Sequence, residues 1–305
     1  MTRGRSGALR FVRRGWETGR DGTDPPSPHR ATARNDSRSR RVDYQEFAEA
    51  HHLEIEIEDR VAIVRLNRPE KRNAVNFAMH EGLERVWRPL GTDPEVGAIV
   101  LTGKGPGFCA GGDMVGFYPD DPGPFDLIRG PRRLVQEMAD CEAPVIAAVN
   151  GVAAGLGATI ALLSDIIYMA DDARIGDTHV KMGLVAGDGG AVIWPLLIGL
   201  HRAKELLMGG ELVQGPEAAA MGLVNHCVPA SELLDRAVAH AKRLAAGPPV
   251  AIRWTKLALN QHLRQSINLT MDTGLAVELL SVGTEDAREA GKAFAEKREP
   301  EFRGR

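Results

Sequence analysis

Two buried-strand patterns, each followed by a loop of small residues, constrain the fold of this chain most. The apolar run Ala98-Ile99-Val100-Leu101-Thr102 leads into Phe108-Cys109-Ala110-Gly111-Gly112-Asp113. The run Val145-Ile146-Ala147-Ala148-Val149 leads into Asn150-Gly151-Val152-Ala153-Ala154-Gly155-Leu156-Gly157. A strand that feeds a loop opening a helix turns backbone N–H groups outward. Two such loops side by side predict a site that stabilises negative charge developing on a carbonyl oxygen.

Strands and helices alternate over the first part of the folded chain, which predicts an α/β core. Strands are expected at 53–57, 61–66, 98–102, 145–149, 166–169 and 224–228, and helices at 76–87, 131–140 and 156–163. From Trp194 onward the pattern is mainly helical, with helices expected at 195–200, 203–208, 216–221, 231–246, 249–263 and 286–297. We therefore expect an α/β core over 46–240 and a helical C-terminal region over 241–305.

Residues 1–45 are rich in Arg, Ser, Pro and Gly and poor in large apolar residues, which predicts disorder. The alternatives are a dispensable extension or mis-assigned start, an organelle transit peptide, and an RNA-binding tail. Acidic residues argue against a transit peptide, and the missing apolar segment argues against a secretory signal. A second Pro/Gly-rich stretch, at 119–124, is expected to form a lid or insertion.

The overall composition points to no special partner. The 305 residues carry a net charge of -3, which gives no reason to expect nucleic acid or a membrane surface as partner. Three scattered cysteines lack metal-ligand spacing and suit a reducing, cytoplasmic compartment. No apolar stretch has transmembrane length, and we expect no metal site, P-loop or dinucleotide-binding fingerprint.

Several motifs resemble the crotonase (enoyl-CoA hydratase/isomerase) superfamily in order and spacing. They are Leu66-Asn67-Arg68-Pro69-Glu70-Lys71-Arg72-Asn73-Ala74, Phe108–Asp113, Val149-Asn150-Gly151, Ser164-Asp165-Ile166-Ile167, and the tail from Gly283-Thr284-Glu285-Asp286 to Ala293-Phe294-Ala295-Glu296-Lys297-Arg298. The resemblance covers roughly residues 50–303. It implies a crotonase-like spiral of ββα units, a helical C-terminal trimerisation region, a homotrimer or hexamer, and an acyl-CoA substrate with no separate cofactor.

The same resemblance implies specific site residues. The backbone N–H groups of Gly112 and Leu156 would form the oxyanion hole, although Leu156 stands where the family usually has glycine. The substrate or its CoA portion would meet Lys71, Asn73, Ala74, Ala110, Gly111, Asp113, Phe294 and Lys297. Surface solvation of the two lysines, helix packing of Phe294 and helix capping by Asp113 are the structural alternatives.

The chain departs from the family at the two catalytic glutamates of a hydratase. Thr159 and His179 occupy those positions, so the usual mechanism of water addition is in doubt. Asp188 follows His179 by nine residues, and a His oriented by a carboxylate is a competent general base. This His–Asp spacing resembles the carbon–carbon hydrolase branch typified by 6-oxocamphor hydrolase, but a second histidine of that branch has no match here. A structural His179, a helix-capping Asp188 and a pocket-lining Thr159 remain the alternatives.

Three functional hypotheses follow from these residues. The first is a hydratase/isomerase-type enzyme of fatty-acid or other acyl-CoA metabolism that forms an enolate, with His179 and Asp188 as the acid/base pair. The second is retro-Claisen hydrolysis of a β-diketone or β-keto thioester. The third is an acyl-CoA-binding protein without catalytic activity.

Overall fold

The computed structural model describes residues 42–113 and 126–305. The expectations for residues 1–41 and for a lid at 119–124 lie outside the described residues. Among the described residues, the first regular element is α1 (Tyr44–Ala50), which starts just before the boundary expected at residue 45. The Asp43 carboxylate accepts hydrogen bonds from the Gln45 and Glu46 backbone N–H groups and so caps this helix.

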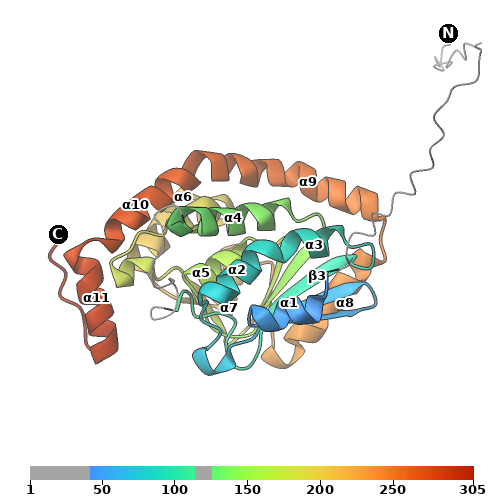
Figure 1. The fold of residues 1–305 in the computed structure, drawn as a ribbon, viewed down its shortest axis with the longest axis horizontal. Helices are drawn as coiled ribbons and strands as arrows, with labels where there is room; N and C mark the ends of the chain where they lie inside the picture. The colour runs from blue at the N-terminus through green and yellow to red at the C-terminus, as the bar shows by residue number, and fades with distance from the viewer. Residues whose placement is uncertain (1–41, 114–125) are drawn as a thin grey trace, which may run out of the picture. The chain divides into compact units, whose positions relative to one another are not determined.

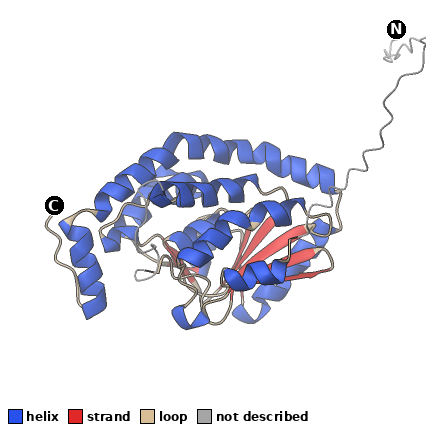
Figure 2. Ribbon diagram, viewed as in Figure 1, coloured by secondary structure: helices blue, strands red, loops and turns tan. Residues whose placement is uncertain are grey.

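A six-stranded sheet forms the centre of the core, in the order β1-β2-β3-β4-β6-β9 (Figure 2). Its strands are β1 (Leu53–Glu58), β2 (Val61–Leu66), β3 (Ala98–Gly103), β4 (Val145–Val149), β6 (Ile166–Ala170) and β9 (His226–Val228). Only β1 and β2 pair antiparallel, and every other neighbouring pair is parallel. Every residue of β3 and β4 is buried, as expected for parallel strands covered on both faces. The six strands predicted from the sequence are all confirmed.

A second, smaller sheet holds the segment that leads to the predicted catalytic residues. It consists of β5 (Ala153–Ala154), β7 (Arg174–Gly176) and β8 (Val213–Gln214), with β7 in the middle. β5 lies within the second glycine loop, and β7 ends just before Asp177. The small sheet therefore sets the glycine loop and the His179 segment next to each other. These strands are too short to give a sequence pattern.

The helices of the core are α2 (Phe77–Arg85), α3 (Trp87–Thr92), α4 (Asp126–Asp140), α5 (Leu156–Leu162), α6 (Gly190–Gly209), α7 (Gly215–Ala220) and α8 (Leu233–Ala245). The sequence predicts two helices at 195–200 and 203–208, but α6 runs through both and starts five residues earlier. It is interrupted at Gly199, whose φ of 76° is outside the helical region. The interruption therefore lies inside the first predicted helix, two residues before the gap expected at 201–202.

The C-terminal region is helical, as predicted. It contains α9 (Pro249–Ser266), a π-helical turn (Ile267–Met271), α10 (Asp272–Val282) and α11 (Glu285–Glu296). Figure 1 shows α9 and α10 running along α4 and α6, and both helices contact α4. The sequence analysis predicts no helix at α10, because exposed apolar residues such as Leu280 obscure its buried face. Among the described helices, none is long and apolar enough to cross a membrane.

Candidate active site

The two glycine loops lie side by side, as the sequence predicts. Cys109 forms a bridge with Ala153, and the Ala154 N–H donates to the Cys109 carbonyl over 2.9 Å. Gly111 has a φ of 96°, and a Cβ there would lie 2.9 Å from the Ala154 carbonyl oxygen. Only glycine therefore permits this approach of the two loops.

Backbone N–H groups of both loops remain available at this junction. Within the described residues, the N–H groups of Asp113 and Gly155 donate to backbone carbonyls, whereas those of Gly112 and Leu156 have no such acceptor. Leu156 is the first residue of α5, where N–H groups lack a partner inside the helix. Gly112 and Leu156 both line one cavity, so the geometry suits a carbonyl oxygen placed between them.

This cavity has a volume of about 270 Å³ and a mostly apolar wall. The apolar side chains are Pro131, Leu156, Met182, Leu184, Leu275, Leu279, Val282 and Phe294. The polar side chains are His80, Thr178, His179, Asp188 and Glu278. An apolar cavity with a few convergent polar groups is the usual form of a small-molecule site. A larger cleft, of about 550 Å³, lies at α11, but its charged side chains pair with one another, as Arg298 does with Glu289.

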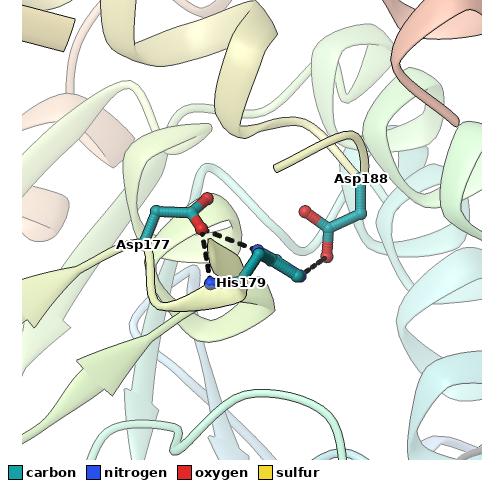
Figure 3. Close-up of side chains that lie close together, drawn as sticks. All are labelled: Asp177, His179 and Asp188. Atoms are coloured by element: carbon teal, nitrogen blue, oxygen red, sulfur yellow. Dashed lines mark hydrogen bonds and ion pairs between the residues drawn. The ribbon is translucent and has the colours of Figure 1, made fainter. Parts of the chain in front are cut away.

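His179 lies between two aspartates (Figure 3). Its Nδ1 is 2.7 Å from the Asp177 carboxylate, which also accepts the His179 backbone N–H over 3.1 Å. Its Nε2 is 3.3 Å from the Asp188 carboxylate. Carboxylates accept hydrogen bonds and donate none when ionised, so both ring nitrogens carry protons in this arrangement.

The charge of His179 follows from the same contacts. Burial alone lowers the pKa of His179, but the charges and hydrogen bonds of Asp188 and Asp177 outweigh it and raise the pKa well above 6.5. These contacts therefore favour the charged, imidazolium form of His179. Asp177 is almost completely buried and does not line the cavity, whereas Asp188 does. Asp177 orients the ring from behind, and Asp188 presents its carboxylate to the cavity.

Glu278 of α10 completes this polar end of the cavity. Its Oε1 lies 4.0 Å from His179 Nε2, and within the described residues its buried Oε2 has no hydrogen-bond partner. Burial and the nearby charge of Asp188 raise the pKa of Glu278 to about 8. The site thus places the Asp188 carboxylate beside a carboxyl group whose pKa is raised above neutral, a pairing typical of acid–base sites.

Sequence reasoning missed Asp177 and Glu278 as site residues. Asp177 had a local signal, since it precedes His179 by two residues in Asp177-Thr178-His179. Glu278 is 99 residues from His179 and lies on a helix with no clear pattern, so nothing in the sequence placed it near the site.

Thr159 lies next to Asp188 rather than at the cavity surface. Its hydroxyl is 3.5 Å from the second carboxylate oxygen of Asp188, and the residue is fully buried. Asp188 does not cap α6; Gly189 occupies that position, and no side chain caps the helix. The Asp188 carboxylate is therefore free of the capping role that the sequence analysis kept as an alternative.

The residues predicted to contact CoA divide into two groups. Ala110, Gly111 and Phe294 line the cavity. Lys71, Asn73, Ala74, Asp113 and Lys297 lie outside its wall. Among these, the Asn73 amide donates to the Lys104 and Gly107 carbonyls, and Asp113 accepts a hydrogen bond from Arg68. The CoA contacts of this second group remain predictions.

Asp177, His179 and Asp188 also form a group of described residues whose ligand atoms lie within 4.8 Å of one another. Both ring nitrogens of His179 already face carboxylates. A metal ion would have to replace one of these contacts, so the arrangement fits an ion pair better than a preformed metal site.

Comparison with known proteins bears on this geometry. Residues 56–305 match the family model "Enoyl-CoA hydratase/isomerase". A short-chain-enoyl-CoA hydratase of Clostridium acetobutylicum is 35% identical over 264 residues, covering 83% of this chain and 98% of that protein. A 1,2-epoxyphenylacetyl-CoA isomerase of Escherichia coli is 35% identical over 254 residues, covering 82% and 97%.

A solved structure shows the same fold. The enoyl-CoA hydratase/isomerase of Mycobacterium paratuberculosis aligns with a TM-score of 0.75 and 39% identity, covering 79% of this chain and 98% of that one. The α/β architecture with a helical C-terminal region is thus the crotonase fold that the motifs predict. The chain belongs to the enoyl-CoA hydratase/isomerase family and is an enzyme of that family.

Proposed function

We propose that this enzyme binds an acyl-CoA thioester in the cavity and stabilises an enolate of its acyl group. The thioester oxygen accepts hydrogen bonds from the Gly112 and Leu156 N–H groups. These two donors stabilise the negative charge that develops on the oxygen when a bond at the neighbouring carbon forms or breaks. The apolar wall accommodates the body of the acyl group.

The polar end of the cavity supplies the proton transfers. The His179–Asp188 pair is the base, and in the resting state the proton acceptor of the pair is the Asp188 carboxylate. The His179 imidazolium stabilises that carboxylate, and Asp177 keeps the ring oriented. Glu278 is the acid, because it retains its proton at neutral pH. Asp188 and Glu278 thus take the two roles that paired glutamates fill in the family's hydratases.

One observation carries this proposal: His179, Asp188 and Glu278 line the same cavity as Gly112 and Leu156. The test is turnover of a short-to-long panel of trans-2-enoyl-CoAs, followed by loss of enoyl absorbance and by product mass. We expect His179→Ala and Asp188→Asn each to lower kcat by about 10²–10⁴-fold. If both variants turn over the best substrate as fast as the wild type, the assignment of these residues is wrong.

A second candidate, hydrolysis of a carbon–carbon bond in a β-keto thioester or β-diketone, is favoured by Glu278. A protonated carboxyl group can donate a hydrogen bond to a ketone oxygen while the Asp188 carboxylate removes a proton from the attacking water. Cleavage creates a new carboxylic acid, so product mass and acid release distinguish it from hydration. Tight binding of CoA esters without any turnover on both panels would favour the third hypothesis, a binding protein.

We also propose that the chain assembles into a homotrimer or hexamer and holds the CoA nucleotide near Lys71 and Lys297. Large apolar side chains that are exposed in the single chain support the assembly, among them Leu200, Met208, Leu269 and Leu280. Sedimentation equilibrium tests the assembly, and the affinity of Lys71→Ala and Lys297→Ala for CoA tests the contacts.

A further inference from the structure

Helix α10 forms one wall of the cavity, and one face of the helix supplies all of its lining residues. Leu275, Glu278, Leu279 and Val282 all line the cavity. Their spacing of three, four and seven residues places them on the same side of an α-helix. The distance between α10 and the His179 segment therefore decides where the Glu278 carboxyl group lies.

Two glycines set this distance. Gly187 is the residue before Asp188. A Cβ at Gly187 would lie 2.3 Å from the Gly274 carbonyl oxygen and 2.7 Å from Glu278 Oε2. A Cβ at Gly274 would lie 3.1 Å from the Gly187 carbonyl oxygen. We call this backbone approach the glycine contact. Glu278 follows Gly274 by four residues, which is one turn further along the same face of α10.

Neighbouring contacts keep α10 in this register. The Val185 N–H donates to the Ser281 hydroxyl over 3.2 Å, about two turns beyond Gly274 along α10. On the other side, the π-helical turn buries Ile267 and Met271 against the core. π-helical turns occur often at functional sites.

We propose that Gly187 and Gly274 are positioning residues, whose glycine contact lets α10 approach closely enough to place the Glu278 carboxyl group beside His179. The inference rests on the proposed function for its catalytic consequence and on geometry alone for the position of Glu278. Neither glycine is needed for its backbone conformation, since neither has a positive φ. Their role follows from the missing side chain.

The two positions give graded perturbations. To accept Gly187→Ala, the backbones must move apart by roughly 1 Å before ordinary van der Waals contact is restored. Gly274→Ala requires a movement of a few tenths of an ångström. Gly291→Ala on α11 is the matched control, because it is also a helical glycine and no atom lies within 4 Å of its added Cβ.

The first readout needs no substrate. The infrared carbonyl band of the protonated Glu278 carboxyl group is identified by its loss in Glu278→Gln, and its titration gives the pKa of Glu278. In the wild type, Asp188, His179 and Asp177 face this group, and the pKa is raised to about 8. We expect the pKa to fall toward 4.5 in Gly187→Ala, to fall less in Gly274→Ala, and to stay unchanged in Gly291→Ala.

The second readout is a double-mutant cycle on kcat. A misplacement of about 1 Å lowers turnover by about 10²-fold, so we expect that loss in Gly187→Ala and a smaller one in Gly274→Ala. Adding Glu278→Gln should cause no further loss, because both changes remove the same proton donor.

The outcomes separate the two proposals. An unchanged Glu278 titration in both glycine variants, or losses in kcat that multiply with that of Glu278→Gln, overturns the positioning role. Full activity of Glu278→Gln would refute Glu278 as the acid but leave the titration as a test of the glycine contact. If Gly187→Ala does not fold, Gly274→Ala tests the same role through smaller changes in the pKa of Glu278 and in kcat.

Discussion

Replacing Glu278 by glutamine should change how the stability of the protein depends on pH. Glu278 has its pKa raised from an ordinary 4.5 to about 8, first by burial and then by the charge of Asp188. Between these two values the folded protein keeps a proton that the unfolded chain releases. The free energy of unfolding of the wild type therefore decreases as pH rises through this window, and the loss is complete above about pH 8. Glutamine carries no charge at any pH and avoids this loss.

The magnitude follows from the same interval. At about 1.4 kcal/mol for each pH unit, the interval from 4.5 to about 8 corresponds to about 5 kcal/mol. Because Glu278 interacts with His179 and Asp188, we take this as an upper limit and expect a difference of about 2–5 kcal/mol. Glu278→Gln should thus gain stability relative to the wild type as pH increases, while losing activity.

Urea unfolding of both proteins at several pH values between 4.5 and 9 measures the difference. Glu217→Gln, an exposed position on α7, serves as the control for removing a carboxylate from the surface. A constant offset between wild type and Glu278→Gln over the whole range would refute the reasoning. It would mean that Glu278 ionises in the folded protein as readily as in the unfolded chain.

Other variants test separate parts of the site and the core. Asp177→Asn should lower kcat by about 10²–10⁴-fold with little change in KM, because it replaces the carboxylate charge that holds the His179 ring from behind with a neutral amide; a larger effect on KM than on kcat would contradict this. Thr159→Val should lower kcat by about tenfold through the loss of one hydrogen bond to Asp188, and Thr159→Ser should retain activity; equal rates for both variants would exclude the hydroxyl from any role. Lys256→Met should destabilise the protein by about 1–3 kcal/mol, measured by urea unfolding, because it leaves the buried Ala143 carbonyl without its donor at 2.9 Å and breaks the ion pair with the more exposed Asp165; an unchanged midpoint would show that these contacts have no net value. The kcat/KM of the wild type should decrease above about pH 8 as Glu278 loses its proton, and a flat profile to pH 9 would exclude it as the acid.

The strands were predictable from the sequence for a physical reason. Parallel strands buried on both faces form continuous apolar runs, and β3 and β4 are runs of that kind. The glycine loops were predictable because small residues directly follow those strands. The interruption of α6 at Gly199 was not predicted, because the expected helix at 195–200 runs through that residue. The continuation of the helix beyond it was not predicted either, since it depends on packing with α9.

The candidate site was predictable only where it is local in sequence. His179 and Asp188 occupy one short segment, so motif and spacing were enough to pair them. The position of Glu278 depends on the π-helical turn and on the contact of Gly274 with Gly187, which are tertiary features without a sequence period. The role of Asp177 depends on which side of the imidazole faces the cavity, and that direction is set by the small sheet around β7.

The π-helical turn at Ile267–Met271 also divides the active site along the chain. In the proposed mechanism, the groups that bind the carbonyl oxygen and accept a proton precede this turn in the sequence, and the group that returns a proton follows it. A nascent or clipped chain ending at the turn would retain the sheet, both glycine loops and the His179 segment, but would lack the proton donor and one wall of the cavity. Under the proposed mechanism, such a fragment would be an open binding site rather than a slower enzyme, and the last helices would be the component that converts binding into turnover.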